Sequence, residues 1–110
     1  MNYIIGDTVT VASGASDTLT LTATRDMKVT KIGFDATGIF KITNSDLQGL
    51  DDFLAASTAA PILGRALSDN GVPLVLDEPL VIPKGTSLTF AVTDLSGAEN
   101  TIGVALIGTA

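Results

Sequence analysis

The sequence contains no cysteine, no histidine and no tryptophan, and aromatic residues make up only 5% of it. Without cysteine there is no disulfide or thiolate chemistry, and without histidine the commonest general base and a common zinc ligand are missing. No apolar run approaches the roughly 18 residues that are needed to cross a bilayer. We therefore expect a protein that is not an enzyme, uses no cofactor or metal ion, and does not bind a membrane.

Charged residues are also scarce, at 16% of the chain, whereas hydrophobic residues reach 45%. A chain of 110 residues is long enough for one core, so we expect a single domain spanning residues 1–110. Few polar side chains remain to cover its surface, and apolar surface should be shielded by copies of the chain or by another protein. The composition thus predicts a homo-oligomer or a docked subunit.

The net charge is −6, which disfavours direct binding of nucleic acid because that affinity depends on Lys and Arg. Four of the six basic residues nevertheless fall in one stretch; they are Arg25, Lys28, Lys31 and Lys41. They form either a positive stripe on one sheet face or a set of solvated strand residues, and we favour the second interpretation. The first residues show no secretory signal, so we expect folding in a cytoplasm.

Alternation of apolar and polar residues with a period of two predicts β-strands over most of the chain. The clearest case is 18–24, where threonines alternate with apolar residues. Between Met27 and Phe34 the alternation slips by one residue near Thr30, which predicts a β-bulge. The segment 62–67 fits either a strand or a helix. Further strands are predicted at 7–12, 39–43, 74–76, 80–82, 87–93 and 101–107.

A helical spacing of apolar residues occurs in one place, where Leu47, Leu50 and Leu54 follow one another at i, i+3 and i+7 with Phe53 alongside. This spacing predicts at most one short helix, between Leu47 and Ser57. The stripe is a candidate protein-interaction surface, although covering the core is the commoner role for such a stripe.

The apolar segment Tyr3, Ile4 and Ile5 is the second candidate for protein interaction. It forms either an edge strand of the same domain, which we favour, or an arm that lies on a neighbouring molecule. In the strand 87–93, Phe90 and Val92 are predicted to face the core. About eight short strands without a long helix predict an all-β protein, an antiparallel β-sandwich that is jelly-roll-like.

Carboxylates that lie close together in the sequence are Asp51 and Asp52, Asp77 and Glu78, and Asp94 and Glu99. A glycosidase needs two carboxyl groups at a defined separation across a cleft, and sugar binding normally uses aromatic platforms that this composition disfavours. No segment has the residue order of an EF-hand calcium loop. We therefore interpret these residues as solvated loop residues and expect no catalytic or metal site.

One long segment resembles a known family. The run LDEPLVIPKGTSLT at 76–89, with VTDLSGAENT at 92–101, is similar to the C-terminal signature of small virion structural proteins of tailed bacteriophages. Upstream, 40–44 resembles the middle strand of those proteins, and 62–64 with 73–74 resembles the stretch that precedes the signature. The resemblance covers residues 39–108.

This resemblance implies a small jelly-roll subunit that binds the major capsid protein and reinforces the shell, known as a capsid decoration or cement protein. It further implies assembly in the host cytoplasm and a final location in the virion. Two alternatives are a head-fibre base or tail-associated β-sandwich module, and a carbohydrate-binding or adhesion domain, because β-sandwiches serve all of these roles.

Overall fold

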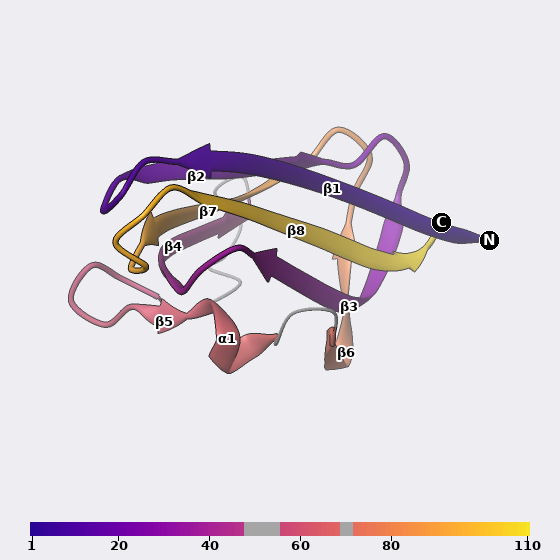
Figure 1. The fold of residues 1–110 in the computed structure, drawn as a ribbon. Helices are drawn as coiled ribbons and strands as arrows, with labels where there is room; N and C mark the ends of the chain where they lie inside the picture. Colours follow the sequence, from indigo (N-terminus) through magenta and orange to yellow (C-terminus); the bar gives the residue numbers. More distant parts are fainter. Residues whose placement is uncertain (48–55, 69–71) are drawn as a thin grey trace.

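The protein folds as two four-stranded antiparallel sheets packed face to face (Figure 1). The computed structural model describes residues 1–47, 56–68 and 72–110. Sheet A contains, in spatial order, β1 (Asn2–Val11), β8 (Asn100–Thr109), β3 (Met27–Ala36) and β6 (Leu74–Ile82). Sheet B contains β2 (Ser16–Thr22), β7 (Ser87–Asp94), β4 (Phe40–Leu47) and β5 (Ile62–Leu63).

The strand orders β1-β8-β3-β6 and β2-β7-β4-β5 are those of an eight-stranded jelly roll. The predicted all-β, jelly-roll-like sandwich is therefore confirmed. Within the described ranges the helical content is the four-residue α1 (Gly64–Leu67), which follows β5. The helix predicted from Leu47 to Ser57 falls largely on residues 48–55, which lie outside the described residues.

The core lies between the two sheets and is built from alternate residues of each long strand. In β7 and β8 every second side chain is buried. Phe90 and Val92 are both 0% exposed, so their predicted inward orientation is confirmed. The Phe90 ring meets the Phe34 ring edge-on at a centroid distance of 5.4 Å, and the Phe34 and Phe40 ring centroids are 5.8 Å apart. These three rings fill the centre of the sandwich.

The predicted bulge in β3 is also confirmed. The pairing of β3 with β8 shifts by one residue between Val29 and Lys31, so that Thr30 has no opposite residue in the register. Gly108 lies beside the bulge, and a Cβ at this glycine would lie only 1.8 Å from the Lys28 carbonyl oxygen. Only glycine lets the two backbones approach this closely.

Two strands are longer than their sequence patterns predict. The segments 74–76 and 80–82 join into the single strand β6, which continues through Pro79. Proline is tolerated there because β6 is the edge of sheet A and needs fewer backbone N–H donors. At the opposite edge, β1 begins at Asn2 and pairs with β8 from its first residue. The edge-strand alternative for Tyr3, Ile4 and Ile5 is therefore confirmed.

Asp7 ties the edges of the two sheets together beside β1. Its Oδ2 atom accepts a hydrogen bond of 2.9 Å from the backbone N–H of Thr20 in β2, and its Oδ1 atom accepts one of 3.0 Å from the N–H of Thr8. A half-buried carboxylate at a strand edge opposes further strand pairing. Asp7 therefore protects this edge while it joins sheet A to sheet B.

Candidate interaction surfaces

The residues predicted to bind another protein fall on different parts of the fold. Tyr3 and Ile5 are half-buried, whereas Ile4 points outward from β1 and is 61% exposed. Leu47 ends β4 in sheet B, where its backbone pairs with Leu88. Leu50, Phe53 and Leu54 lie outside the described residues. Of the predicted set, Ile4 is the side chain that the described structure presents to solvent.

Tyr3 fastens the beginning of β1 to the turn that follows β2. The backbone N–H of Thr24 donates a 3.1 Å hydrogen bond to the Tyr3 hydroxyl oxygen, which also shares a hydrogen bond with the Thr24 hydroxyl. These bonds, that of the Thr24 side chain above all, lower the pKa of the Tyr3 phenol from its ordinary value. Tyr3 thus holds the edge strand in place, and its side chain is partly buried against the core.

The outer face of sheet A carries a regular pattern of side chains across β1, β8 and β3. The strand registers place residues in rows that run across the strands. The first row is Ile4, Ile107 and Lys31; the middle row is Gly6, Ala105 and Gly33; the third row is Thr8, Gly103 and Asp35. The middle row has no side chain larger than a methyl group, and together with Gly103 on β8 it forms a shallow trough.

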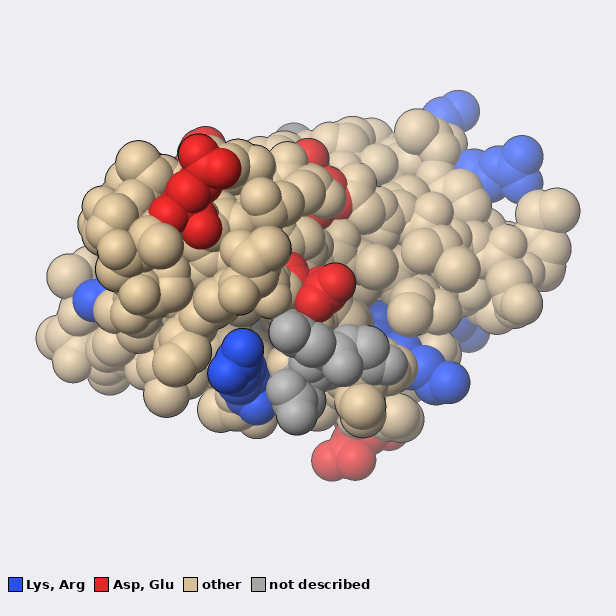
Figure 2. Space-filling model, viewed as in Figure 1, with Lys and Arg blue, Asp and Glu red and all other residues tan. Residues whose placement is uncertain are grey.

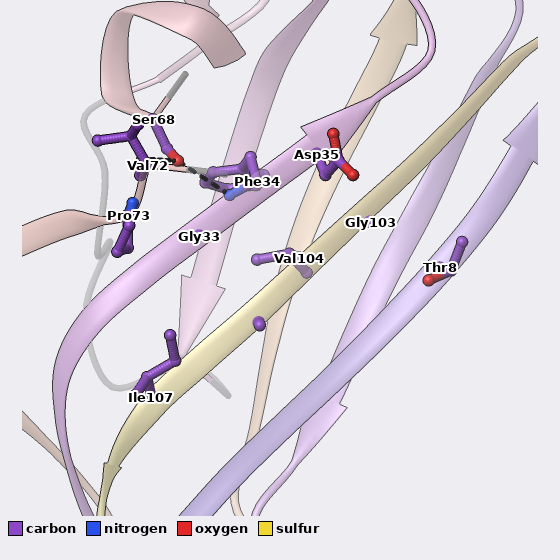
Figure 3. Close-up of a pocket in the computed structure, with 11 residues that line it drawn as sticks. Thr8, Gly33, Phe34, Asp35, Ser68, Val72, Pro73, Gly103, Val104 and Ile107 are labelled. Atoms are coloured by element: carbon purple, nitrogen blue, oxygen red, sulfur yellow. Dashed lines mark hydrogen bonds between the residues drawn. The ribbon is translucent and has the colours of Figure 1, made fainter. Parts of the chain in front are cut away.

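A pocket of about 370 Å³ opens on this face (Figure 3). Its lining includes Gly33, Gly103 and Ala105, and Figure 3 shows Ile107 at one end. At one side of the pocket, the Ser68 hydroxyl oxygen accepts a 3.2 Å hydrogen bond from the backbone N–H of Phe34 in β3. The lining is mainly apolar.

Sequence reasoning missed the apolar residues on the edge strand β6. Val75 is 64% exposed and Val81 is 58% exposed, and they extend the outward rows at Lys31 and Lys28 respectively. Val72, just before the strand, is also 64% exposed. Alternation within 74–76 and 80–82 was the available signal, but both faces of each segment are apolar, so the sequence did not reveal which face is outward.

Asp94 is the centre of a buried polar network at one end of the sandwich. Its carboxylate accepts hydrogen bonds from the backbone N–H groups of Gly14, Ser96 and Gly97, from the Ser96 hydroxyl, and from Asn100 Nδ2, at 2.6–3.2 Å. These bonds, that from Gly14 above all, hold the pKa of the carboxyl far below its usual range. Because the acceptor positions are filled from within the chain, the network serves the structure of the loops.

Asn100 links this network to the turn between β3 and β4. Its Oδ1 atom accepts hydrogen bonds of 3.1 Å from the Thr37 hydroxyl and from the N–H of Gly38, and its Nδ2 atom donates to the carbonyl oxygens of Gly38 and Ile39. Asp94 and Asn100 are 2% and 0% exposed. Together they join three loops that are distant in the sequence.

The outer face of sheet B is rich in hydroxyl groups. They come from neighbouring strands, β2 and β7, and are Ser16, Thr18, Thr20, Thr22, Ser87, Thr89 and Thr93. Two cross-strand pairs are hydrogen-bonded: Ser16 with Thr93 at 2.6 Å and Thr22 with Ser87 at 2.7 Å. Pairs of this kind stabilise adjacent strands, and this structural role accounts for the hydroxyl groups on this face.

The four clustered basic residues do not share one face. Lys28 and Lys31 point outward from β3 in sheet A, Arg25 lies in the turn before it, and Lys41 belongs to β4 in sheet B. Figure 2 shows charged side chains scattered over one side of the molecule among a larger uncharged area. The interpretation as solvated strand residues is the one that this placement supports.

Among the described residues, no group of three or more Asp, Glu, His or Cys side chains is placed to hold a metal ion. None of the described helices has the length and apolar character needed to span a membrane. Comparisons with known proteins gave no matching family model, no matching curated protein and no matching solved structure.

Proposed function

We propose that this chain is a virion structural protein, a capsid decoration subunit that binds the major capsid protein of a tailed bacteriophage and acts by binding alone. The observation that carries the proposal is the jelly-roll order of the strands in a chain whose segment 39–108 resembles such proteins. Double-sheet jelly rolls are common in viral capsid domains, but the fold alone does not determine function.

The surface of the molecule is suited to such a role. Ile4, Val75 and Val81 are large apolar side chains exposed on one sheet. Their burial against another protein surface, a capsid protein or a second copy of the chain, would exclude water from an apolar centre, the usual arrangement in stable protein interfaces. The open faces of the two sheets offer relatively rigid docking surfaces, because hydrogen-bonded ladders and bonds such as those of Asp7 and Tyr3 hold the strands in place.

Sugar binding, the alternative of a different class, finds less support. Phe34, Phe40 and Phe90 are in the core and Tyr3 is engaged by Thr24. Stacking on sugars needs an exposed ring, and none of these four provides a free one. A carbohydrate role would therefore have to rely on groups other than these rings.

Co-sedimentation with phage particles tests the proposal. Particles from the source culture are separated on a density gradient, and each fraction is probed with an antibody raised against the recombinant chain. The proposal expects the chain in the intact-particle fractions at a fixed ratio to the major capsid protein, and its retention after a high-salt wash. If the chain is found only in the free-protein fractions while the capsid protein is in the particle fractions, the proposal is wrong.

A further inference from the structure

We propose that the outer face of sheet A binds the same face of a second copy of this chain, forming a two-fold symmetric dimer. The inference does not depend on the proposed function. It rests on the three rows defined above, because the first and third rows lie at equal distances on either side of the middle row.

On each strand, the first-row and third-row residues are equally far from the middle-row residue. Counting outward from the middle row, Ile4 and Thr8 are equidistant from Gly6 on β1, and Lys31 and Asp35 are equidistant from Gly33 on β3. On β8, Ile107 and Gly103 are equidistant from Ala105. A two-fold axis lying along the middle row, between two stacked sheets, therefore places the first row of each copy over the third row of the other.

This superposition matches both charge and shape. Lys31 of each copy lies over Asp35 of the other, which gives two ion pairs related by the axis. Within the described chain, neither residue has an ion-pair partner. Ile107 of each copy lies over Gly103 of the other, where the missing side chain leaves space for it. An axis along β8 instead would stack equivalent rows and set the charged Lys31 of each copy over the apolar Ile4 of the other, which is disfavoured.

The edge of the face also fits an isologous contact. Pro73 lies beside Gly33, with its Cβ 3.9 Å from the position of an added Cβ, so the segment at 72–73 extends the middle row. Residues on a two-fold axis meet their own counterparts. Pro73 then meets Pro73 of the second copy, and Val72, the next residue along the chain and 64% exposed, lies beside this contact at the end of the trough.

The size of the face predicts a reversible dimer. The outward residues of β1 from Asn2 to Thr10 define five rows, which continue across β8 and β3 and in part across β6. With strands about 4.8 Å apart and rows about 6.8 Å apart, this face covers about 600 Å². A dimer would bury about 1,200 Å² in total, which lies at the lower limit of specific interfaces. We therefore expect an equilibrium between monomer and dimer that depends on concentration.

Charge exchange tests the arrangement directly. Lys31→Asp places a carboxylate over Asp35 of the partner copy, twice per dimer, and Asp35→Lys does the same with ammonium groups. Each single variant should raise the dimer dissociation constant at least about tenfold, because like charges oppose each other across the interface. The double variant Lys31→Asp/Asp35→Lys should restore it. Lys84→Asp and Glu99→Lys are matched controls, since both residues are exposed in turns between sheets.

The measurement is sedimentation equilibrium of each folded variant over a series from micromolar to millimolar concentration. A second variant tests the trough itself: Gly33→Lys should be accommodated in the monomer, where an added Cβ meets no atom closer than 3.9 Å, yet should abolish dimerisation. The proposal is overturned if the chain stays monomeric throughout the series, if either single charge variant dimerises like the original, or if the double variant fails to recover.

Discussion

The substitution Phe90→Ala tests the packing of the sandwich most sharply. Phe90 is 0% exposed, pairs with Leu19 and Ser45 on the neighbouring strands, and meets Phe34 edge-on at 5.4 Å. Replacing a buried phenylalanine by alanine costs about 3–5 kcal/mol, because transfer energy is lost and a cavity remains. The aromatic contact contributes about 0.5–1.5 kcal/mol of its own, so we expect a value in the upper part of that range.

Urea denaturation followed by circular dichroism measures this change as a difference in the free energy of unfolding, provided the slope with urea stays constant. The corresponding fall in Tm is about 12–20 °C for a domain of this size. Thr89→Ala, one residue away on the opposite face of β7, is the control and should cost less than about 1 kcal/mol. Equal losses for the two variants, or no loss for Phe90→Ala, would refute the assigned register.

Three further changes probe other parts of the fold. Ser45→Ala should raise the free energy of unfolding by about 1 kcal/mol, because the buried Ser45 hydroxyl has no hydrogen-bond partner among the described residues; a comparable loss in urea titrations would contradict this. Asp94→Asn should destabilise the fold at pH 7. Because the folded-state pKa of Asp94 lies below its unfolded value of about 3.9, this stabilisation is present above that value and is lost as the pH falls below it. The stability difference between Asp94→Asn and the original chain should therefore narrow in acid, and a constant difference from pH 7 to pH 2 would count against the assigned cause. Gly108→Ala should cost about 1–3 kcal/mol by forcing the β3 and β8 backbones apart, whereas Gly33→Ala should be neutral or stabilising; thermal melts of both distinguish a packing effect from a general effect of glycine.

The strand pattern was largely predictable because one face of each long strand is buried. The alternation in 18–24, 87–93 and 101–107 reflects the burial of every second residue, and the slip near Thr30 marks a real bulge. The pattern failed at 77–79, where two acidic residues and a proline resemble a turn. There the strand continues because an edge strand tolerates residues that a central strand does not.

The surfaces were much less predictable, since they depend on contacts between residues that are far apart in the sequence. Ile4, Lys31 and Ile107 form one row only because β8 lies between β1 and β3, and no local pattern specifies that order. The same is true of Asp94 and Asn100, whose local signal was only that of a turn. The sequence-based preference for Tyr3, Ile4 and Ile5 located one edge of the outer face of sheet A. Its centre at Gly6, Ala105 and Gly33 has no side chain larger than a methyl group, so no hydrophobic pattern marks it in the sequence.

The most direct test of the proposed role is a density map of the intact phage particle by electron cryo-microscopy. We predict an eight-stranded jelly roll, fitted by residues 1–47, 56–68 and 72–110, on the outer surface of the capsid shell in contact with the major capsid protein. A shell that is fully accounted for by other chains, with this jelly roll found only in a tail or fibre or not at all, would contradict the proposed role.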